Sequence, residues 1–196
     1  MIFLDNIADS FGLMINSSTE SSIISDNFTV FVMLSENEGF GLVYAEAMAH
    51  GIPCIASDRD AAQEVIALLD QISAVVLGPG LGRSDGARQF LQAVLTARGR
   101  MDNPPPTVVD GDALSLLADW PDWSTLTGAG LLLTPHHGEM ARLTNRSSAS
   151  VGEEPWRTAS EQARAWQQTV VLKGPFSTVA EPAGDTWTYP YANPGL

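Results

Sequence analysis

The sequence predicts an α/β protein with a mostly parallel β-sheet, and three observations support this fold class. Short apolar runs of strand composition alternate with helical segments, the runs are apolar on consecutive residues, and glycine-rich turns follow several of them. Consecutive apolar residues are typical of parallel strands that are buried on both faces. Alternating strands and helices predict right-handed crossovers in one Rossmann-like sheet between two helix layers, which makes three layers.

The N-terminal third contains a strand–helix–strand pattern. We expect strands over 29–34 and 53–56, with a helix over 42–50 between them that ends at Gly51. Glycine directly after a helical run is typical of a helix C-terminus. A further helix over 61–69 leads into the rest of the chain.

The remaining two thirds continue the alternation. A helix is expected to begin at Ser84 or Asp85, because serine and aspartate cap helix N-termini. A second helix is expected over 154–167. The expected strands are 74–77, 107–109, 131–133 and 170–172, followed by 177–180 and 186–189, which form a C-terminal β-hairpin around Ala183-Gly184.

The composition excludes several classes of partner. The net charge is −13, from ten basic and 23 acidic residues, so we expect neither nucleic acid nor an anionic membrane as a partner. No apolar run approaches the roughly 20 residues that a membrane helix needs. The single cysteine, Cys54, lies in an apolar run, and the N-terminus lacks the basic region of a signal peptide. We therefore expect a cytoplasmic protein.

A first motif places two glutamates, Glu38 and Glu46, around Gly39 and Gly41. Glycines at this position let backbone N–H groups approach an anion at a helix N-terminus. Residues 2 to about 66 thereby resemble the donor-sugar site of retaining glycosyltransferases with the GT-B fold. The resemblance implies that Glu38 contacts a donor sugar and that Glu46 holds the ribose of a sugar nucleotide.

This first segment departs from the glycosyltransferase pattern. That family uses upstream Arg and Lys residues to neutralise the diphosphate, whereas Arg59 is the first basic residue of this chain. The acceptor-binding domain of that family also has no counterpart. The alternative interpretation is that the segment serves only as a strand–helix–strand unit of the sheet.

A second set of motifs runs from about residue 66 to the end. It resembles the ATP- or ADP-dependent NAD(P)H-hydrate dehydratases, which have the ribokinase-like fold. The motifs that carry this resemblance are Gly78-Pro79-Gly80-Leu81-Gly82, Val109-Asp110-Gly111-Asp112, Thr134-Pro135-His136-His137-Gly138-Glu139, Leu172-Lys173-Gly174 and Asn193-Pro194-Gly195-Leu196. His137 stands where that family usually has proline, and Gly111 where it usually has alanine.

Each of these motifs follows an expected strand, so their polar groups should meet at the carboxyl edge of the sheet, where open α/β sheets bind ligands. Gly78, Gly80 and Gly82 form a candidate backbone nest for phosphate. The resemblance implies that the chain binds ATP or ADP with Mg²⁺. The other residues implied in nucleotide or substrate binding are Asp110, Asp112, His136, Lys173 and Asn193.

Within that set, the resemblance implies that Asp112 and His136 face the hydrated nicotinamide nucleotide and that Lys173 contacts phosphates. Asp110 is expected to orient its loop. The alternatives are a solvated surface amine for Lys173, the only lysine in the chain, and a structural role for His136. Glu139 is expected to be a carboxylate at a helix N-terminus, which the helix dipole favours.

In the dehydratase family, a Gly-Ser-Gly-Asp turn with the catalytic Asp follows Asn-Pro-Gly-Leu, and this sequence ends at Leu196. We therefore expect a nucleotide-binding chimera of residues 1–65 and 66–196 in one compact domain, with no catalytic residue and no metal ligand. Exposed sheet edges favour self-association, so a homo-oligomer is expected. The alternatives are a sugar-nucleotide-binding fragment and a purely structural fold.

Overall fold

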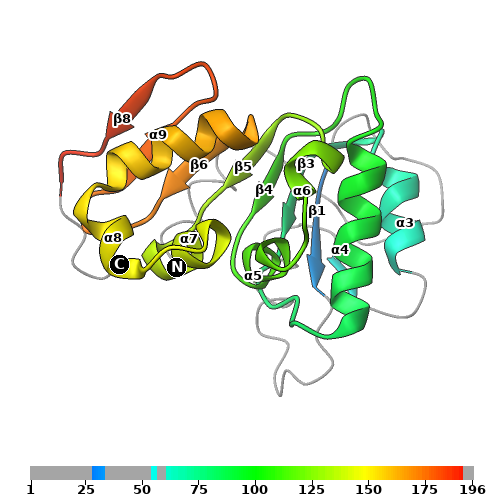
Figure 1. Cartoon of the computed structure of the whole chain (residues 1–196). Helices are drawn as coiled ribbons and strands as arrows, with labels where there is room; N and C mark the ends of the chain where they lie inside the picture. The colour runs from blue at the N-terminus through cyan, green and yellow to red at the C-terminus, as the bar shows by residue number, and fades with distance from the viewer. Residues whose placement is uncertain (1–27, 34–53, 57–60, 192–196) are drawn as a thin grey trace.

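The computed structural model describes residues 28–33, 54–56 and 61–191 (Figure 1). The expected helix over 42–50, the glutamate motif of Glu38, Gly39, Gly41 and Glu46, and Asn193 lie outside the described residues. The described strands form one sheet of eight strands in the order β2-β1-β3-β4-β5-β6-β7-β8. Strands from both expected segments therefore lie in the same sheet.

Six neighbouring strands of the sheet are parallel, and the last two form antiparallel pairs. The expected α/β fold with a mostly parallel sheet is thus confirmed, including the hairpin of β7 and β8, while the described helices supply one of the two expected helix layers. The strands are β1 (Phe28–Met33), β2 (Cys54–Ala56), β3 (Ile72–Leu77), β4 (Thr107–Val109), β5 (Leu131–Leu133), β6 (Thr169–Leu172), β7 (Thr178–Ala180) and β8 (Thr186–Thr188).

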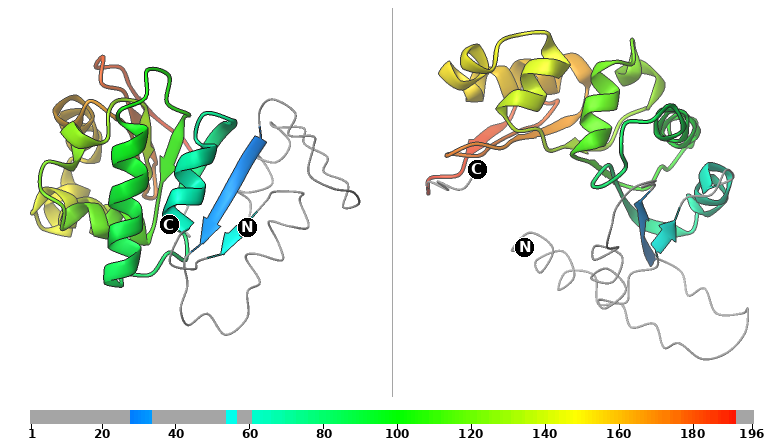
Figure 2. Two further views of the ribbon diagram at one scale, coloured as in Figure 1. Left: turned by 90° about the vertical axis from the view of Figure 1, so that its right-hand side faces the viewer. Right: turned by 90° about the horizontal axis from the view of Figure 1, so that it is seen from below.

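The described helices form a layer over one face of the sheet, as the right-hand view of Figure 2 shows. Helices that connect successive strands in one direction share a face, because the crossovers are right-handed. The helices are α3 (Ala61–Leu68), α4 (Asp85–Arg98), α5 (Asp112–Ala118), α6 (Trp123–Leu126), α7 (His137–Thr144), α8 (Ser148–Glu153) and α9 (Pro155–Trp166).

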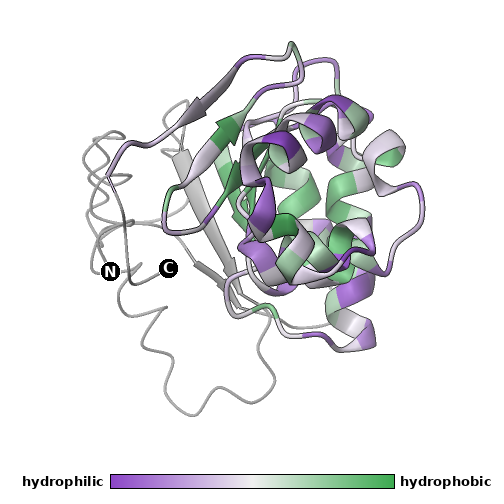
Figure 3. Ribbon diagram, turned by 60° about the vertical axis from the view of Figure 1, so that its left-hand side comes forward, coloured by the Kyte–Doolittle hydropathy of each residue, from purple (hydrophilic) through white to green (hydrophobic). Residues whose placement is uncertain are grey.

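The core lies between the helices and the sheet. In β5, Leu131 and Leu133 are buried while Leu132 is half-buried, and β4, β6, β7 and the last four residues of β3 show the same alternation. Alternate residues of a strand point to opposite faces of the sheet, so the buried set packs under the helix layer. Figure 3 shows the hydrophobic colour gathering on these strands and on the inner side of the helices.

Most expected elements agree with the structure within a few residues. Strands 107–109 and 131–133 have the expected bounds, and the Ser84 hydroxyl accepts a 3.1 Å hydrogen bond from the Ala87 N–H to cap α4. Helices α5, α6 and α8 were not expected. They have seven, four and six residues, too few for a helical repeat of apolar positions to be recognised.

A buried arginine ties together the amino edge of the sheet. Arg98, at the end of α4, is 1% exposed. Burial lowers its pKa by desolvation, and hydrogen bonds to neutral acceptors offset that cost. Its guanidinium donates to Pro105 O (3.0 Å), Thr107 Oγ1 (2.8 Å), Thr127 O (3.1 Å), Ala129 O (2.9 Å) and Gly130 O (3.0 Å).

Gln168 completes this amino-edge cluster from the other side. Its Oε1 accepts a 2.7 Å hydrogen bond from the Leu131 N–H, and its Nε2 donates to Gly128 O at 2.6 Å. The side chain is buried. Arg98 and Gln168 thus satisfy the backbone groups of the loop that enters β5, which would otherwise be buried without partners.

Candidate functional site

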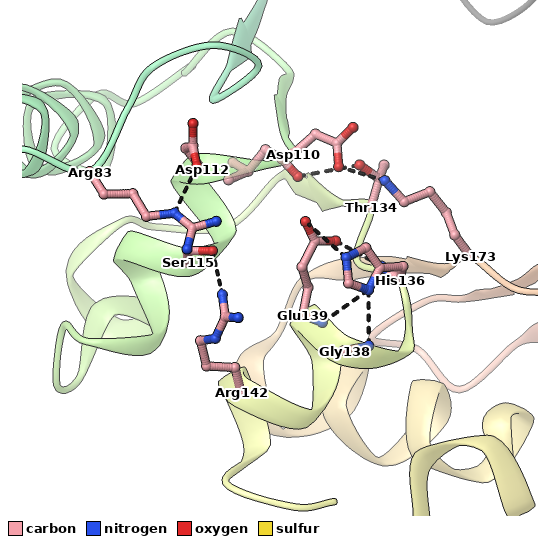
Figure 4. Close-up of polar contacts among 11 residues, drawn as sticks. Arg83, Asp110, Asp112, Ser115, Thr134, His136, Gly138, Glu139, Arg142 and Lys173 are labelled. Carbon is pink, nitrogen blue, oxygen red and sulfur yellow. Dashed lines mark hydrogen bonds and ion pairs between the residues drawn. The ribbon is translucent and has the colours of Figure 1, made fainter. Parts of the chain in front are cut away.

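The polar residues of the dehydratase-like motifs gather at the carboxyl edge of the sheet. The ends of β3, β4, β5 and β6 lie side by side because these strands are parallel neighbours. Each of these strands is followed by a motif residue, and Figure 4 shows Arg83, Asp110, Asp112, His136 and Lys173 close to this edge. The expected convergence of the motifs is therefore present in the described residues.

Lys173 and Asp110 form the central contact of the edge. The Lys173 Nζ lies 2.7 Å from Asp110 Oδ1, and the two side chains are 25% and 32% exposed. Lys173 also donates its backbone N–H to Pro135 O at 2.8 Å, and it forms a parallel bridge with His136. The amine of Lys173 is thus directed across the strand ends toward Asp110 rather than into bulk solvent.

Asp112 holds the glycine turn. Its Oδ2 accepts a 3.1 Å hydrogen bond from the Gly82 N–H, and its Oδ1 lies 2.8 Å from Arg83 Nε. Arg83 was not among the expected site residues. The sequence did contain a signal that could have identified it, because Arg83 directly follows the last glycine of the turn. A cation at that position reaches Asp112, which follows β4.

The glycine turn itself allows a close approach between the loops after β3 and β4. Gly78 has φ +120°, and a Cβ on it would overlap the carbonyl oxygen of Asp110 and lie 2.6 Å from Ala113 Cβ. Within the turn, the Leu81 N–H donates to Gly78 O at 3.0 Å. The N–H groups of Leu81 and Gly82 are therefore engaged inside the protein, and the Gly82 contact ties the turn to the loop after β4.

His136 caps helix α7. Its Nδ1 accepts hydrogen bonds from the N–H groups of Gly138 (2.9 Å) and Glu139 (3.2 Å), while Glu139 Oε2 accepts from the His136 N–H at 2.8 Å. This reciprocal arrangement is a capping box, and it confirms Glu139 as a helix N-terminal carboxylate. Because Nδ1 is an acceptor, the neutral ring carries its proton on Nε2, which lies 3.6 Å from Glu139 Oε1.

His137 packs against the backbone that carries Lys173. A Cβ on Gly174 would lie 2.8 Å from His137 Nε2, and a Cβ on Gly152 would lie 3.4 Å from His137 Nδ1. The ring thus fills the space between α8 and the residue after Lys173. Glycine at 174 leaves room for it.

Within the described part of the chain, no group of three or more His, Cys, Asp or Glu side chains gathers in a way that would hold a metal ion. None of the described helices has both the length and the apolar character that crossing a membrane requires.

A model of the NAD(P)H-hydrate dehydratase family matches residues 16–196. The match runs through the segment that resembles a glycosyltransferase donor site and through the expected junction between two segments. It therefore gives no support to the glycosyltransferase resemblance or to a chimera.

Named relatives agree with the family match. The chain is 39% identical over 146 residues to the bifunctional NAD(P)H-hydrate repair enzyme Nnr of Moorella thermoacetica, covering 74% of this chain and 26% of that protein. It is 35% identical over 150 residues to the Nnr of Mycobacterium tuberculosis, covering 76% and 28%. The chain thus spans about a quarter of the length of these relatives.

Solved structures show the same fold. A ribokinase-like superfamily protein from Enterococcus faecalis superposes with a TM-score of 0.64 at 21% identity, over 85% of this chain and 55% of that one. An ADP/ATP-dependent NAD(P)H-hydrate dehydratase from Bacillus subtilis, co-crystallised with ATP and Mg²⁺, gives a TM-score of 0.59 at 23% identity, over 84% and 64%. The ribokinase-like fold, the motifs at the carboxyl edge and the family match all agree. The chain therefore belongs to the NAD(P)H-hydrate dehydratase family.

Proposed function

We propose that the carboxyl edge binds an adenine nucleotide with Mg²⁺ and the hydrated nicotinamide nucleotide, as part of an ATP- or ADP-dependent NAD(P)H-hydrate dehydratase. The observation that carries this proposal is the Lys173–Asp110 contact. It brings the only lysine of the chain to the ligand-binding edge of the sheet from 63 residues away in sequence. The ATP-bound relative from Bacillus subtilis supports the nucleotide class.

The contact suits a phosphate group. A lysine ammonium has three N–H donors, and Asp110 Oδ1 accepts one of them. The partial exposure of both side chains lets a phosphate oxygen accept another. Asp110 then holds the amine in place, whereas the sequence predicted that Asp110 orients its own loop. Mg²⁺ would accompany the nucleotide phosphates.

Asp112 and His136 are proposed to face the hydrated nicotinamide ring. The cap fixes the His136 ring so that Nε2–H is its available donor, and Arg83 and Gly82 fix the Asp112 carboxylate. The glycine turn would then act by letting the loops after β3 and β4 pack closely; its glycines are Gly78, Gly80 and Gly82.

Binding and positioning, rather than proton abstraction, are the proposed roles of these residues. Among the described residues of the edge, Asp110 pairs with Lys173, Asp112 with Arg83, and Glu139 with the cap of α7. Each of these carboxylates therefore already has a partner that fixes its position. The shared sheet also supports the proposal that the chain is a single domain.

The test is a thermal-unfolding scan with and without Mg-ADP or Mg-ATP, on the wild type and on Lys173→Ala. A ligand at about 100 times its Kd adds roughly 2.7 kcal/mol to stability. The matched control is Arg100→Ala, which removes an exposed cation after α4, on the amino side of the sheet. The proposal predicts a nucleotide shift in the wild type and in Arg100→Ala but not in Lys173→Ala. An equal shift in all three proteins would contradict it.

A further inference from the structure

One polar side chain lies within the buried run of helix α5. Residues 113–117 are all buried, and Ser115, which is 5% exposed, is the only polar residue among them. A buried hydroxyl needs a hydrogen-bond partner, whereas an apolar side chain of similar size would need none. The roles proposed above for the carboxyl edge do not use Ser115.

Arg142 of α7 supplies that partner. Its Nη1 donates to Ser115 Oγ at 2.6 Å, and Figure 4 shows the arginine side chain extending from α7 to α5. The arginine is exposed to solvent, so its other N–H groups can be hydrated while this one is committed to the serine. Among the described residues, no other side-chain hydrogen bond joins these two helices.

Both ends of this contact lie one helical turn from the proposed substrate site. Asp112 is three positions before Ser115 in α5, and Glu139, which closes the His136 cap, is three positions before Arg142 in α7. Residues three apart lie on the same side of a helix. The contact therefore joins the helix face that begins at Asp112 to the helix face that begins at the His136 cap.

The Arg142–Ser115 contact adds direction to the packing of α5 against α7. The two helices lie in contact, and the side chains that they bury are otherwise apolar. Apolar contact is non-directional, and packed helices can slide past each other by small shear movements. Because a hydrogen bond has a preferred distance and angle, this contact restrains the sliding of α5 along α7.

We propose that Arg142 is a positioning residue, whose hydrogen bond to Ser115 sets the separation of Asp112 and His136 for the hydrated nicotinamide ring. This inference rests on the proposed function and adds the residue that holds the two ring-facing side chains in register. The contacts of Asp112 with the glycine turn and the cap formed by His136 orient each side chain separately. Neither set of contacts joins α5 to α7.

The experiment measures the Kd of hydrated NADH and of tripolyphosphate by calorimetry, without ATP or ADP, for the wild type, Ser115→Ala, Arg142→Met and the double variant. The inference predicts that all three variants weaken the binding of hydrated NADH by the same factor, about 3- to 30-fold. The factor is shared because each variant removes the same single contact. Tripolyphosphate should bind unchanged, since the Lys173–Asp110 contact remains.

Two control variants accompany these measurements. Arg142→Lys keeps a donor that can reach Ser115, so it should bind hydrated NADH more tightly than Arg142→Met does. Arg88→Met breaks the 3.7 Å ion pair between Arg88 and Asp119 at the far end of α5. It should bind hydrated NADH as the wild type does, because this pair does not join α5 to α7.

The double variant separates a positioning role from a purely structural one. Arg142→Met leaves the buried Ser115 hydroxyl without a partner and should destabilise the protein. The double variant removes both partners, so its stability in urea denaturation should recover toward that of the wild type. If the affinity for hydrated NADH recovers together with stability, the contact supports only the fold and the inference is overturned.

Two further outcomes separate the inference from the proposed function. If Ser115→Ala binds hydrated NADH as the wild type does while Lys173→Ala loses tripolyphosphate, the proposed phosphate site stands and Arg142 is not a positioning residue. If the wild type does not bind hydrated NADH, the substrate part of the proposed function fails together with the inference.

Discussion

The two edges of the parallel sheet hold their polar side chains in different ways. At the amino edge, Arg98 and Gln168 are buried, and all their contacts are to neutral groups of the protein. At the carboxyl edge, Asp110, Asp112 and Lys173 are partly exposed and pair with opposite charges. A ligand can reach and share the second set of contacts but not the first.

This difference separates stabilising residues from binding residues of similar chemistry. A buried polar group that loses its partner costs about 1–3 kcal/mol. Every buried polar group of the amino edge therefore has to keep its hydrogen-bond partner. An exposed ion pair contributes about 0–1 kcal/mol. Its partners can therefore be exchanged for ligand atoms at little cost to the fold.

The largest expected effect is at the amino edge. Arg98→Met removes a donor from five acceptors, of which Pro105 O keeps the Thr107 hydroxyl. It should lower the free energy of unfolding by about 3–5 kcal/mol, measured by urea denaturation. Arg100→Met, two residues along the chain, should change it by less than about 0.5 kcal/mol. Equal effects of the two substitutions would remove the distinction between the edges.

Gly78→Ala should produce the next largest effect, because it combines positive φ with a clash against the Asp110 backbone. We expect a loss of more than about 2 kcal/mol in the free energy of unfolding. A Cβ on Gly86, in the first turn of α4, would meet only Ser84 Oγ at 3.7 Å, an ordinary van der Waals contact. Gly86→Ala should therefore stabilise the protein by about 0.5–1 kcal/mol. A neutral Gly78→Ala would contradict the tight contact between the two loops.

Substitutions at the N-cap of α7 test whether His136 stabilises the protein by capping that helix. His136→Ala removes the side-chain acceptor of the Gly138 and Glu139 N–H groups and should cost about 0.5–2 kcal/mol in urea denaturation. His136→Asn keeps a capping side chain and should restore most of that loss. If asparagine does not rescue stability, the ring contributes through another contact.

Lys173→Met should have a small effect on stability, under about 1 kcal/mol, because its ion pair with Asp110 is partly exposed to solvent. The same variant should lose the nucleotide-dependent increase in unfolding temperature. A stability loss as large as that of Arg98→Met would mean that both edges serve the fold alone.

The smallest effect is expected for a fully solvated pair on α9. A hydrogen bond from Arg157 lowers the pKa of Glu161, so the pair stabilises the protein above the ordinary glutamate range and loses that contribution as pH falls through the lowered pKa. Glu161→Gln should be barely distinguishable from the wild type in urea denaturation at pH 7, and the difference should vanish at acid pH. A difference that grows at acid pH would contradict this sign.

The sequence was sufficient to predict the sheet and the edge where the motifs meet. Strand composition, glycine turns and the Ser84 cap are local signals, so β4, β5 and the start of α4 could be located without a structure. The seven-residue α5 is buried along nearly its whole length, so it lacks the polar face that would have indicated a helix.

The pairing within the site could not be predicted in the same way. The partner of Lys173 is 63 residues away and that of Arg83 is 29 residues away, and no local pattern specifies such contacts. The hydrogen bond from the Gly82 N–H to Asp112 joins residues 30 positions apart. It depends on how closely the loops after β3 and β4 pack, which no local sequence pattern specifies.

The most direct test of the account uses the fact that Lys173 is the only lysine. Incorporation of ¹³C-labelled lysine gives one set of lysine side-chain NMR signals, those of Lys173, and leaves its three N–H donors intact. Titration with Mg-ADP should shift the Lys173 signal to saturation, whereas titration with Mg²⁺ alone should leave it in place. If the Lys173 signal stays unmoved at millimolar nucleotide, the carboxyl edge does not bind phosphate through Lys173.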